Sequence, residues 1–330
     1  MTLVPKFGAA NPNAADYKKY RANKNQRMAA RPLRADAAIS LDAPWRTLWP
    51  ARDQYGRGTC VAFGVIAAIE LLRAREVDLA PERLSEQFLH ERMLSAHPLS
   101  EAERATIPDG GALLRQAWQV IEHQGLVDGE RVPYRPAAHG LSAAGPEAQS
   151  DAIIAAKSQR FECISYGRVG AASEGEDPRT DFFMPGNGIA QRLHDFLADG
   201  YPVVIGVPLF VHVSGLTNWT LPSALSSGVV YCPEDEGAPA IEGPRDDGHV
   251  VCLTGFRPDP DEPMGGWFTF RNSWGPEFAA RALGSEDAKS ATGRGNGILS
   301  ATHVNEYCWE YLVPGPDRSE GIVGDAPTAA

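Results

Sequence analysis

The segment from Asp53 to Leu72 constrains the fold more than any other part of the chain. It begins Asp-Gln-Tyr-Gly-Arg-Gly-Thr-Cys and continues into a run of Val, Ala, Phe, Ile and Leu that leaves few positions to face solvent. A helix that is apolar on every side is normally buried. We therefore expect a long central helix that begins at Cys60, with other elements packed around it.

A cysteine at the start of a helix lies where the thiolate is favoured over the thiol, because unpaired amides and the positive end of the helix dipole gather there. Gln54 precedes Cys60 by six residues across a glycine-rich spacer. Its amide is of the right type to donate a hydrogen bond to an oxyanion beside the sulfur. A lone cysteine in an apolar run is more often inert core, so a nucleophile also requires a base elsewhere in the chain.

The second half of the sequence supplies a candidate base and a candidate orienting group. His249 begins an apolar strand, and Asn272 ends a second strand within the sequence Asn-Ser-Trp-Gly. The Pro- and Gly-rich residues 257 to 266 join the two strands, which indicates a hairpin that brings both side chains together. The asparagine carbonyl would then hold the imidazole in one tautomer, and Trp274 would shield this hydrogen bond from water. We expect Cys60 and His249 to rest as a thiolate–imidazolium pair.

With these residues in this order, the chain resembles a papain-like cysteine peptidase over most of its length. The resemblance implies that Cys60 is the nucleophile, Gln54 the oxyanion-hole residue, His249 the general base, Asn272 the orienting residue and Trp274 the shielding indole. Further segments resemble the family in sequence order: Leu84-Ser85-Glu86-Gln87, Asp109-Gly110-Gly111 and Gly295-Asn296-Gly297-Ile298-Leu299-Ser300.

The resemblance also implies where a substrate would lie. The backbone of Gly110 and Gly111 would hydrogen-bond an extended peptide, and Val250 would border the pocket beside the base. Arg57 occupies the position at which secreted relatives usually carry a disulfide-forming cysteine, and Val61 replaces a tryptophan that commonly follows the nucleophile. Three acidic, Gly- or Ser-rich segments are expected to be surface insertions that shape substrate choice: residues 139–152, 170–188 and 233–247.

The implied fold is an α+β, papain-like two-lobe structure, with a helical left lobe around the nucleophile helix and an antiparallel β-barrel-like right lobe. A chain of 330 residues exceeds what one hydrophobic core usually serves, which agrees with two lobes. We expect a basic arm over residues 1–38, a helical lobe over 39–150, a β-rich lobe over 151–314 and a disordered tail over 315–330. A peptide or protein substrate would bind extended in the cleft between the lobes.

The N-terminal arm differs in charge from the rest of the chain. Residues 1–37 carry eight basic and two acidic side chains, a net charge of +6, whereas the whole chain has a net charge of −11. Such a segment is typical of a solvated arm. The functional alternative is a short pro-segment that folds over the acidic body and across the cleft. Nucleic-acid binding is not expected, because the acidic body would repel phosphate.

Cysteine usage and hydropathy bear on the compartment. Cys163 and Cys252 fall within expected strands, which favours buried free thiols over bridges and a reducing compartment. We find neither a conventional signal peptide nor an apolar run of about 20 residues that could span a membrane. The sequence therefore predicts a cytoplasmic protein, or one exported by a route that does not use a conventional signal.

The sequence indicates no metal or cofactor, because it contains no His-Glu-x-x-His, no paired Cys-x-x-Cys and no phosphate-binding glycine loop. The acidic runs 234–236 and 259–262 could hold a cation, but such runs are usually solvated loops. The remaining histidines have no motif around them and are interpreted as surface or structural residues: His90, His97, His123, His139, His194, His212 and His303.

The resulting prediction is a cysteine-type peptidase that hydrolyses peptide bonds with a Cys-His-Asn triad and a glutamine oxyanion hole. The same groups could serve a thiol amidase, an isopeptidase or an acyltransferase on the same scaffold. An inactive binding module is a further alternative, which the working residue types at all four catalytic positions disfavour.

Overall fold

The structure is a computed structural model of the whole chain. It describes the following residues, and the account below concerns these alone: 9–10, 32–35, 37–79, 81–98, 111–136, 146–157, 159–172, 175–281 and 293–317.

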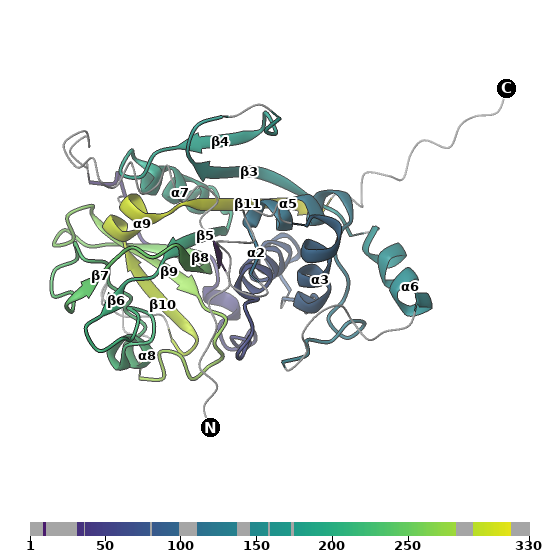
Figure 1. Cartoon of the computed structure of the whole chain (residues 1–330), viewed down its shortest axis with the longest axis horizontal. Helices are drawn as coiled ribbons and strands as arrows, with labels where there is room; N and C mark the ends of the chain where they lie inside the picture. The colour runs from purple at the N-terminus through teal and green to yellow at the C-terminus, as the bar shows by residue number, and fades with distance from the viewer. Residues whose placement is uncertain are drawn as a thin grey trace.

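Helix α2 (Cys60–Val77) runs through the centre of the molecule, as Figure 1 shows. Every residue from Cys60 to Leu72 is buried, and the helix ends where Asp78 adopts the left-handed conformation. The expected helix start and the expected burial on all sides are both confirmed.

Helices cover one side of α2 and form the first lobe. α3 (Glu86–Ala96) begins after Ser85, whose side chain accepts a hydrogen bond from the Phe88 amide at 2.9 Å and thereby caps the helix. α5 (Leu114–His123) packs against both α2 and α3. The start of α5 is held by the carboxylate of Glu310, which accepts hydrogen bonds from the amides of Leu114 and Arg115.

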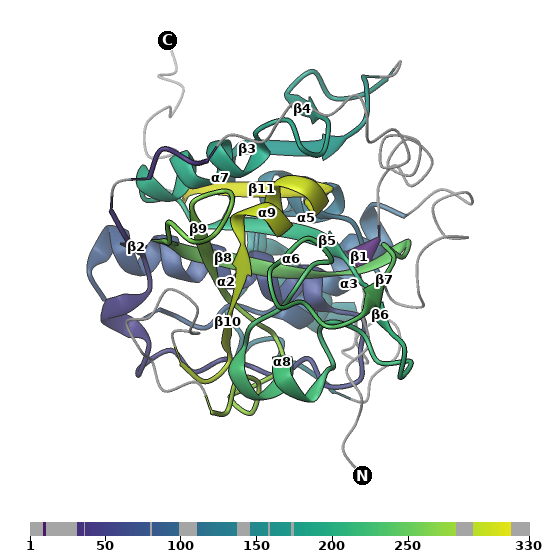
Figure 2. The ribbon, with the colours of Figure 1, turned by 90° about the vertical axis from the view of Figure 1, so that its left-hand side faces the viewer.

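A large mixed sheet forms the other lobe (Figures 1 and 2). Its hydrogen-bonded order is β10-β9-β8-β5-β11-β3-β4, and the described pairs are antiparallel except for β3 with β4. The strands are β3 (Phe161–Val169), β4 (Thr180–Phe183), β5 (Val203–Pro208), β8 (Asp247–Pro258), β9 (Gly266–Arg271), β10 (Asn296–Ser300) and β11 (Glu310–Asp317).

Shorter elements surround this sheet. Two-residue strands β1 (Ala9–Ala10) and β2 (Ile39–Ser40) pair with opposite ends of β8. The others are η2 (Ala43–Trp45), α7 (Ile189–Ala198), β6 (Val211–His212), α8 (Pro222–Ser227), β7 (Ile241–Glu242) and α9 (Ala301–Tyr307). The path of described strands runs from β10 to β4, and together with the helices around α2 it gives the expected α+β architecture.

Three elements bear on the expected segment boundaries. α6 (Pro146–Lys157) begins in the expected insertion 139–152 and spans the expected lobe boundary at residue 150. β4 lies within the expected insertion 170–188, and the role of both segments as insertions stays a prediction. β11 continues to Asp317, past the expected tail boundary, because Asp317 still pairs with Phe161. Residues 318–330 and most of the arm lie outside the described residues.

The two lobes meet where α2 crosses β8. A Cβ atom on Gly64 would lie 2.8 Å from Cγ1 of Val250 and 3.1 Å from Cγ1 of Val204, so only glycine fits without displacement. Gly64 lies one helical turn after Cys60, and Val250 follows His249. This approach therefore brings the first turn of α2 against the histidine-bearing end of β8.

All five cysteines are free thiols, including the expected buried thiol of Cys252. None of the described helices combines the length and the apolar character that crossing a membrane requires.

The close approach of the lobes predicts a specific coupling. Gly64→Ala should lower the free energy of unfolding by about 1–3 kcal/mol, because the added methyl overpacks the junction. In a Val250→Ala background the same change should cost clearly less, since the nearest atom is gone. Chemical denaturation of the two single variants and the double variant measures this coupling. Additive effects would contradict the packing argument.

Candidate active site

Cys60 and His249 occupy the junction between the lobes. Cys60 is the first residue of α2, and His249 lies near the start of β8, with both side chains completely buried. The Gly64–Val250 approach described above fixes the two elements against each other. The structure thus brings the predicted nucleophile and the predicted base to the same region from opposite lobes.

His249 is oriented by Asn272, which follows the end of β9. The Nε2 atom of His249 lies 2.8 Å from Oδ1 of Asn272. The same oxygen accepts a hydrogen bond from the Ser273 amide at 2.8 Å, so it acts as an acceptor and Nε2 carries the proton. A neutral imidazole in this tautomer has its lone pair on Nδ1.

Two indoles enclose the imidazole. The ring of Trp274 lies 4.9 Å from that of His249, and the ring of Trp219 lies 4.7 Å from it in an edge-on arrangement. Trp274 is the predicted shielding residue. Trp219 was not predicted, and its one sequence signal is an aromatic residue within the polar stretch Thr217-Asn-Trp-Thr220.

Burial in this apolar surrounding lowers the pKa of His249 to about 4, although the hydrogen bond to Asn272 acts in the opposite direction. The structure therefore favours a neutral imidazole. The thiolate–imidazolium pair expected from the sequence stays a prediction, because a thiolate at Cys60 would itself favour the imidazolium.

Gln54 is completely buried and held at both ends of its side chain. Its Nε2 donates to the carbonyl oxygen of Arg57 at 2.6 Å, and its Oε1 accepts a hydrogen bond from the Ser273 hydroxyl. The Gln54 amide also donates to the Ser273 carbonyl at 2.7 Å. Gln54 is thus fixed to the residue that follows Asn272.

Arg57 ties the loop before Cys60 to the helical lobe. Its Nη1 donates to Oε1 of Gln87 at 2.7 Å and to the carbonyl of Arg135 at 2.8 Å, and its guanidinium lies 5.0 Å from the ring centre of Tyr134. Tyr134 in turn donates to the Gln54 carbonyl at 2.8 Å. Polar contacts of Arg57 therefore anchor the loop at the position where the resemblance implies a cysteine in secreted relatives.

A buried ion network anchors the start of the same loop. Nη2 of Arg52 lies 2.8 Å from the carboxylate of Glu70 on α2, and its Nε lies 2.6 Å from Glu86 on α3. The indole of Trp49 also donates to Glu70, at 2.9 Å. Buried charges are tolerated only when paired and hydrogen-bonded, so these contacts fix the loop between the two helices.

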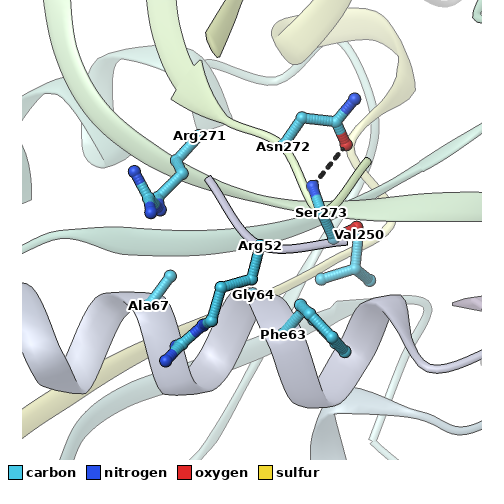
Figure 3. A pocket seen from close by; sticks show the side chains of 8 residues that line it. All are labelled: Arg52, Phe63, Gly64, Ala67, Val250, Arg271, Asn272 and Ser273. Carbon is cyan, nitrogen blue, oxygen red and sulfur yellow. Dashed lines mark hydrogen bonds between the residues drawn. The ribbon is translucent and has the colours of Figure 1, made fainter. Parts of the chain in front are cut away.

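A small pocket lies beside Asn272, between α2 and the end of β9 (Figure 3). It leaves about 10 Å³ for the centre of a water-sized sphere, which is room for about one water molecule. The Nδ2 atom of Asn272 is buried and lacks a hydrogen-bond partner among the described residues. Its lining residues are Arg52, Phe63, Gly64, Ala67, Val250, Arg271, Asn272 and Ser273.

Val250 lines this internal pocket, which is too small for a substrate side chain, and its role toward substrate stays a prediction. Gly110 lies outside the described residues. Gly111 is buried, and the next residue, Ala112, forms a parallel bridge with Ala9. Ala9 also pairs with Gly248, so β1 lies between the predicted substrate-binding segment and the histidine-bearing strand.

Two carboxylates of the acidic run 259–262 are buried rather than solvated, whereas Glu234, Glu236 and Asp261 are exposed, as expected for solvated loops. Oδ2 of Asp259 accepts a hydrogen bond from the Trp267 indole at 2.9 Å, and the buried carboxylate of Glu262 accepts one from the Met264 amide at 2.8 Å. These two carboxylates stabilise the β8–β9 turn through hydrogen bonds inside it. His90 is buried, and desolvation followed by the nearby Arg57 charge lowers its pKa to about 3, in agreement with a structural role.

Comparison with known proteins supports the fold. The sequence matches no family model and no curated protein. Among solved structures, xylellain, a cysteine protease from Xylella fastidiosa, is similar with a TM-score of 0.56 at 18% identity, over 94% of this chain and 97% of that chain. Procathepsin L2, a digestive proteinase from Tenebrio molitor larval midgut, is similar with a TM-score of 0.51 at 17% identity, over 86% of this chain and 69% of that chain. The chain therefore has the papain-like cysteine peptidase fold.

The anchoring by Arg57 can be tested by removing its polar head. Arg57→Met keeps much of the side-chain volume but leaves the Arg135 carbonyl without this donor, and should lower the free energy of unfolding by about 2–3 kcal/mol. Arg73→Met removes a partly exposed ion pair with Glu82 and serves as the control, with an expected cost below about 1 kcal/mol. Equal losses in the two variants, measured by urea denaturation, would contradict the anchoring role.

Proposed function

We propose that the chain is a cysteine peptidase that hydrolyses peptide bonds, with Cys60 as nucleophile and His249 as general base. The observation that carries this proposal is the 2.8 Å hydrogen bond between His249 and Asn272, formed at the junction where α2 begins with Cys60. The papain-like fold supports the same chemistry.

The site geometry suggests how the reaction proceeds. Nδ1 of the neutral His249 imidazole accepts the thiol proton as the Cys60 sulfur attacks the substrate carbonyl carbon. The Gln54 side chain and the Cys60 amide stabilise the resulting oxyanion. The imidazolium then donates its proton to the leaving amine, and the thioester forms as the C–N bond breaks. Water, deprotonated by His249, hydrolyses the thioester and regenerates the thiol.

Asn272 acts by orienting His249 rather than by contacting substrate. Its carbonyl oxygen faces Nε2, which directs Nδ1 to the other side of the ring. The two indoles exclude water from this hydrogen bond and thereby strengthen it. A peptide substrate would lie extended between the lobes, along Gly110 and Gly111.

We further propose that the N-terminal arm covers this cleft. The support is β1, whose Ala9 pairs with Gly248 beside the base and bridges Ala112 beside Gly111. An extended substrate would require the same backbone groups, so β1 and substrate exclude each other. The opposite net charges of arm and body favour the covered form.

The catalytic assignment predicts a graded mutant series. Cys60→Ala should abolish peptide turnover without unfolding the chain, and Gln54→Ala should lower turnover by roughly a hundredfold through loss of one oxyanion donor. Asn272→Ala should have a smaller effect than Cys60→Ala, because it acts through His249. Turnover on a mixed peptide library, with circular dichroism as the fold control, measures these effects.

Covalent labelling separates the peptidase from its alternatives. An epoxide inactivator of papain-like enzymes should label Cys60, located by mass spectrometry, while the half-buried Cys163 stays unlabelled. Labelling without peptide cleavage would point to amidase or transferase chemistry. Unlabelled Cys60 in both the full chain and a chain that begins at Pro32 would sink the proposal.

The arm proposal predicts faster turnover without β1. A chain that begins at Pro32 retains the hydrogen bond from the Leu33 amide to the Met264 carbonyl, at 2.8 Å, and should fold with similar stability. It should cleave peptides at least several-fold faster than the full chain. A synthetic peptide of residues 1–31 should slow it again, whereas the same peptide with Ala9→Asp should not, because Ala9 is buried. Equal rates for the full and shortened chains would show that β1 does not limit access.

A further inference from the structure

The structure contains a second cluster of side chains that could bind a ligand. It lies on elements other than those that carry the candidate catalytic residues. Cys232, Asp235 and His303 are all buried, and each offers one ligand atom within 4.8 Å of the other two. Cys232 and Asp235 belong to the turn that precedes β7, and His303 lies in the first turn of α9. The sequence alone indicated a solvated loop and a structural histidine at these positions.

The histidine of this cluster is prepared to act as a ligand. Nδ1 of His303 lies 3.2 Å from the carbonyl oxygen of Val230, so Nδ1 carries the proton and the lone pair is on Nε2. Nε2 is buried and has no hydrogen-bond partner among the described residues. Histidines that bind metals typically donate their other ring N–H to a carbonyl or carboxylate in this way.

The carboxylate is also held in place. Oδ2 of Asp235 accepts a hydrogen bond from the Cys232 amide at 2.8 Å, and Oδ1 accepts one from the Ser300 hydroxyl. The Ser300 oxygen in turn accepts from the His303 amide at 2.8 Å and caps α9. A single hydrogen-bonded network therefore fixes the turn and the helix start that together present the three ligand atoms.

We propose that Cys232, Asp235 and His303 bind a Zn²⁺ ion. One sulfur, one oxygen and one imidazole nitrogen are ligand types that Zn²⁺ accepts, whereas Ca²⁺ and Mg²⁺ prefer oxygen alone. Binding forms a Zn–S bond as the Cys232 S–H bond breaks, and the proton passes to solvent. Thiolate and carboxylate then neutralise the two positive charges, which suits a buried site. A water molecule completes the tetrahedral set.

The ion would stabilise the segment that holds Trp219 against His249 in the candidate active site. The turn that carries Cys232 also supplies the Tyr231 carbonyl, which accepts a hydrogen bond from the Asn218 side chain at 2.9 Å. Asn218 precedes Trp219, the indole that packs on His249. A metal that links this turn to α9 would therefore help to hold Trp219 in place. The role of the metal is structural.

The test uses the untagged full chain with Cys60→Ala, so that the candidate nucleophile cannot bind the metal. After removal of bound metal by a chelator, the protein should take up one Zn²⁺ per chain by elemental analysis and melt several degrees higher. Co²⁺ in place of Zn²⁺ should give a thiolate charge-transfer band in the near ultraviolet. Failure to bind either ion would overturn the proposal.

Two ligand variants and one matched cysteine variant make the result specific. Cys232→Ser should abolish the charge-transfer band, and His303→Gln should weaken Co²⁺ binding at least tenfold while the chain stays folded by circular dichroism. Cys252→Ser, at another buried free thiol, should leave band and affinity unchanged. A band that survives Cys232→Ser, or one lost equally in Cys252→Ser, would refute the site. None of these readouts involves turnover, so they are independent of the proposed peptidase activity.

Discussion

The burial of α2 on every side is the constraint on which the rest of the structure depends. A helix this apolar requires neighbours all round, and α3 and α5 supply them on one side while β5, β8 and β11 supply them on the other. The buried part of the helix carries one charged residue, Glu70. Because a buried charge must be paired, Glu70 binds Arg52, which lies in the loop that leads to Gln54. Enclosing the helix therefore positions Cys60 at the lobe junction and brings the Gln54 loop to it.

The same enclosure sets the electrostatics of the site. His249 lies between two indoles and away from water, so its neutral form is favoured, and its hydrogen bond to Asn272 determines which ring nitrogen carries the proton. A neutral imidazole is the form that can accept a proton from a thiol. β1 adds to this burial by pairing at Gly248. If β1 leaves the cleft as proposed, any water that reaches His249 would raise the pKa of its imidazole toward the ordinary value.

Features encoded by local spacing were predictable, and features that depend on distant contacts were not. The start of α2 at Cys60 and the hairpin that joins His249 to Asn272 both follow from patterns within a few residues. The anchoring by Arg57 depends on Arg135, 78 residues away, and the cap of α5 depends on Glu310, 196 residues from Leu114. Trp219 was missed for the same reason, since it lies in a turn while its partner His249 lies on β8. Residue type alone does not reveal such pairings.

The buried carboxylates could not be recognised from composition alone. They also show how a carboxylate that completes a turn differs from one that could bind a metal. Asp259 and Glu262 fall in a charged, Pro-containing run, yet backbone amides and an indole supply their donors and complete a turn. Glu310 is satisfied in the same way by the start of α5. The cluster around Asp235 is different, because its carboxylate is satisfied while Nε2 of the neighbouring His303 has no hydrogen-bond partner among the described residues. A buried polar atom left in this state costs free energy unless something binds it, and a cation shared with a thiolate and a carboxylate removes that cost.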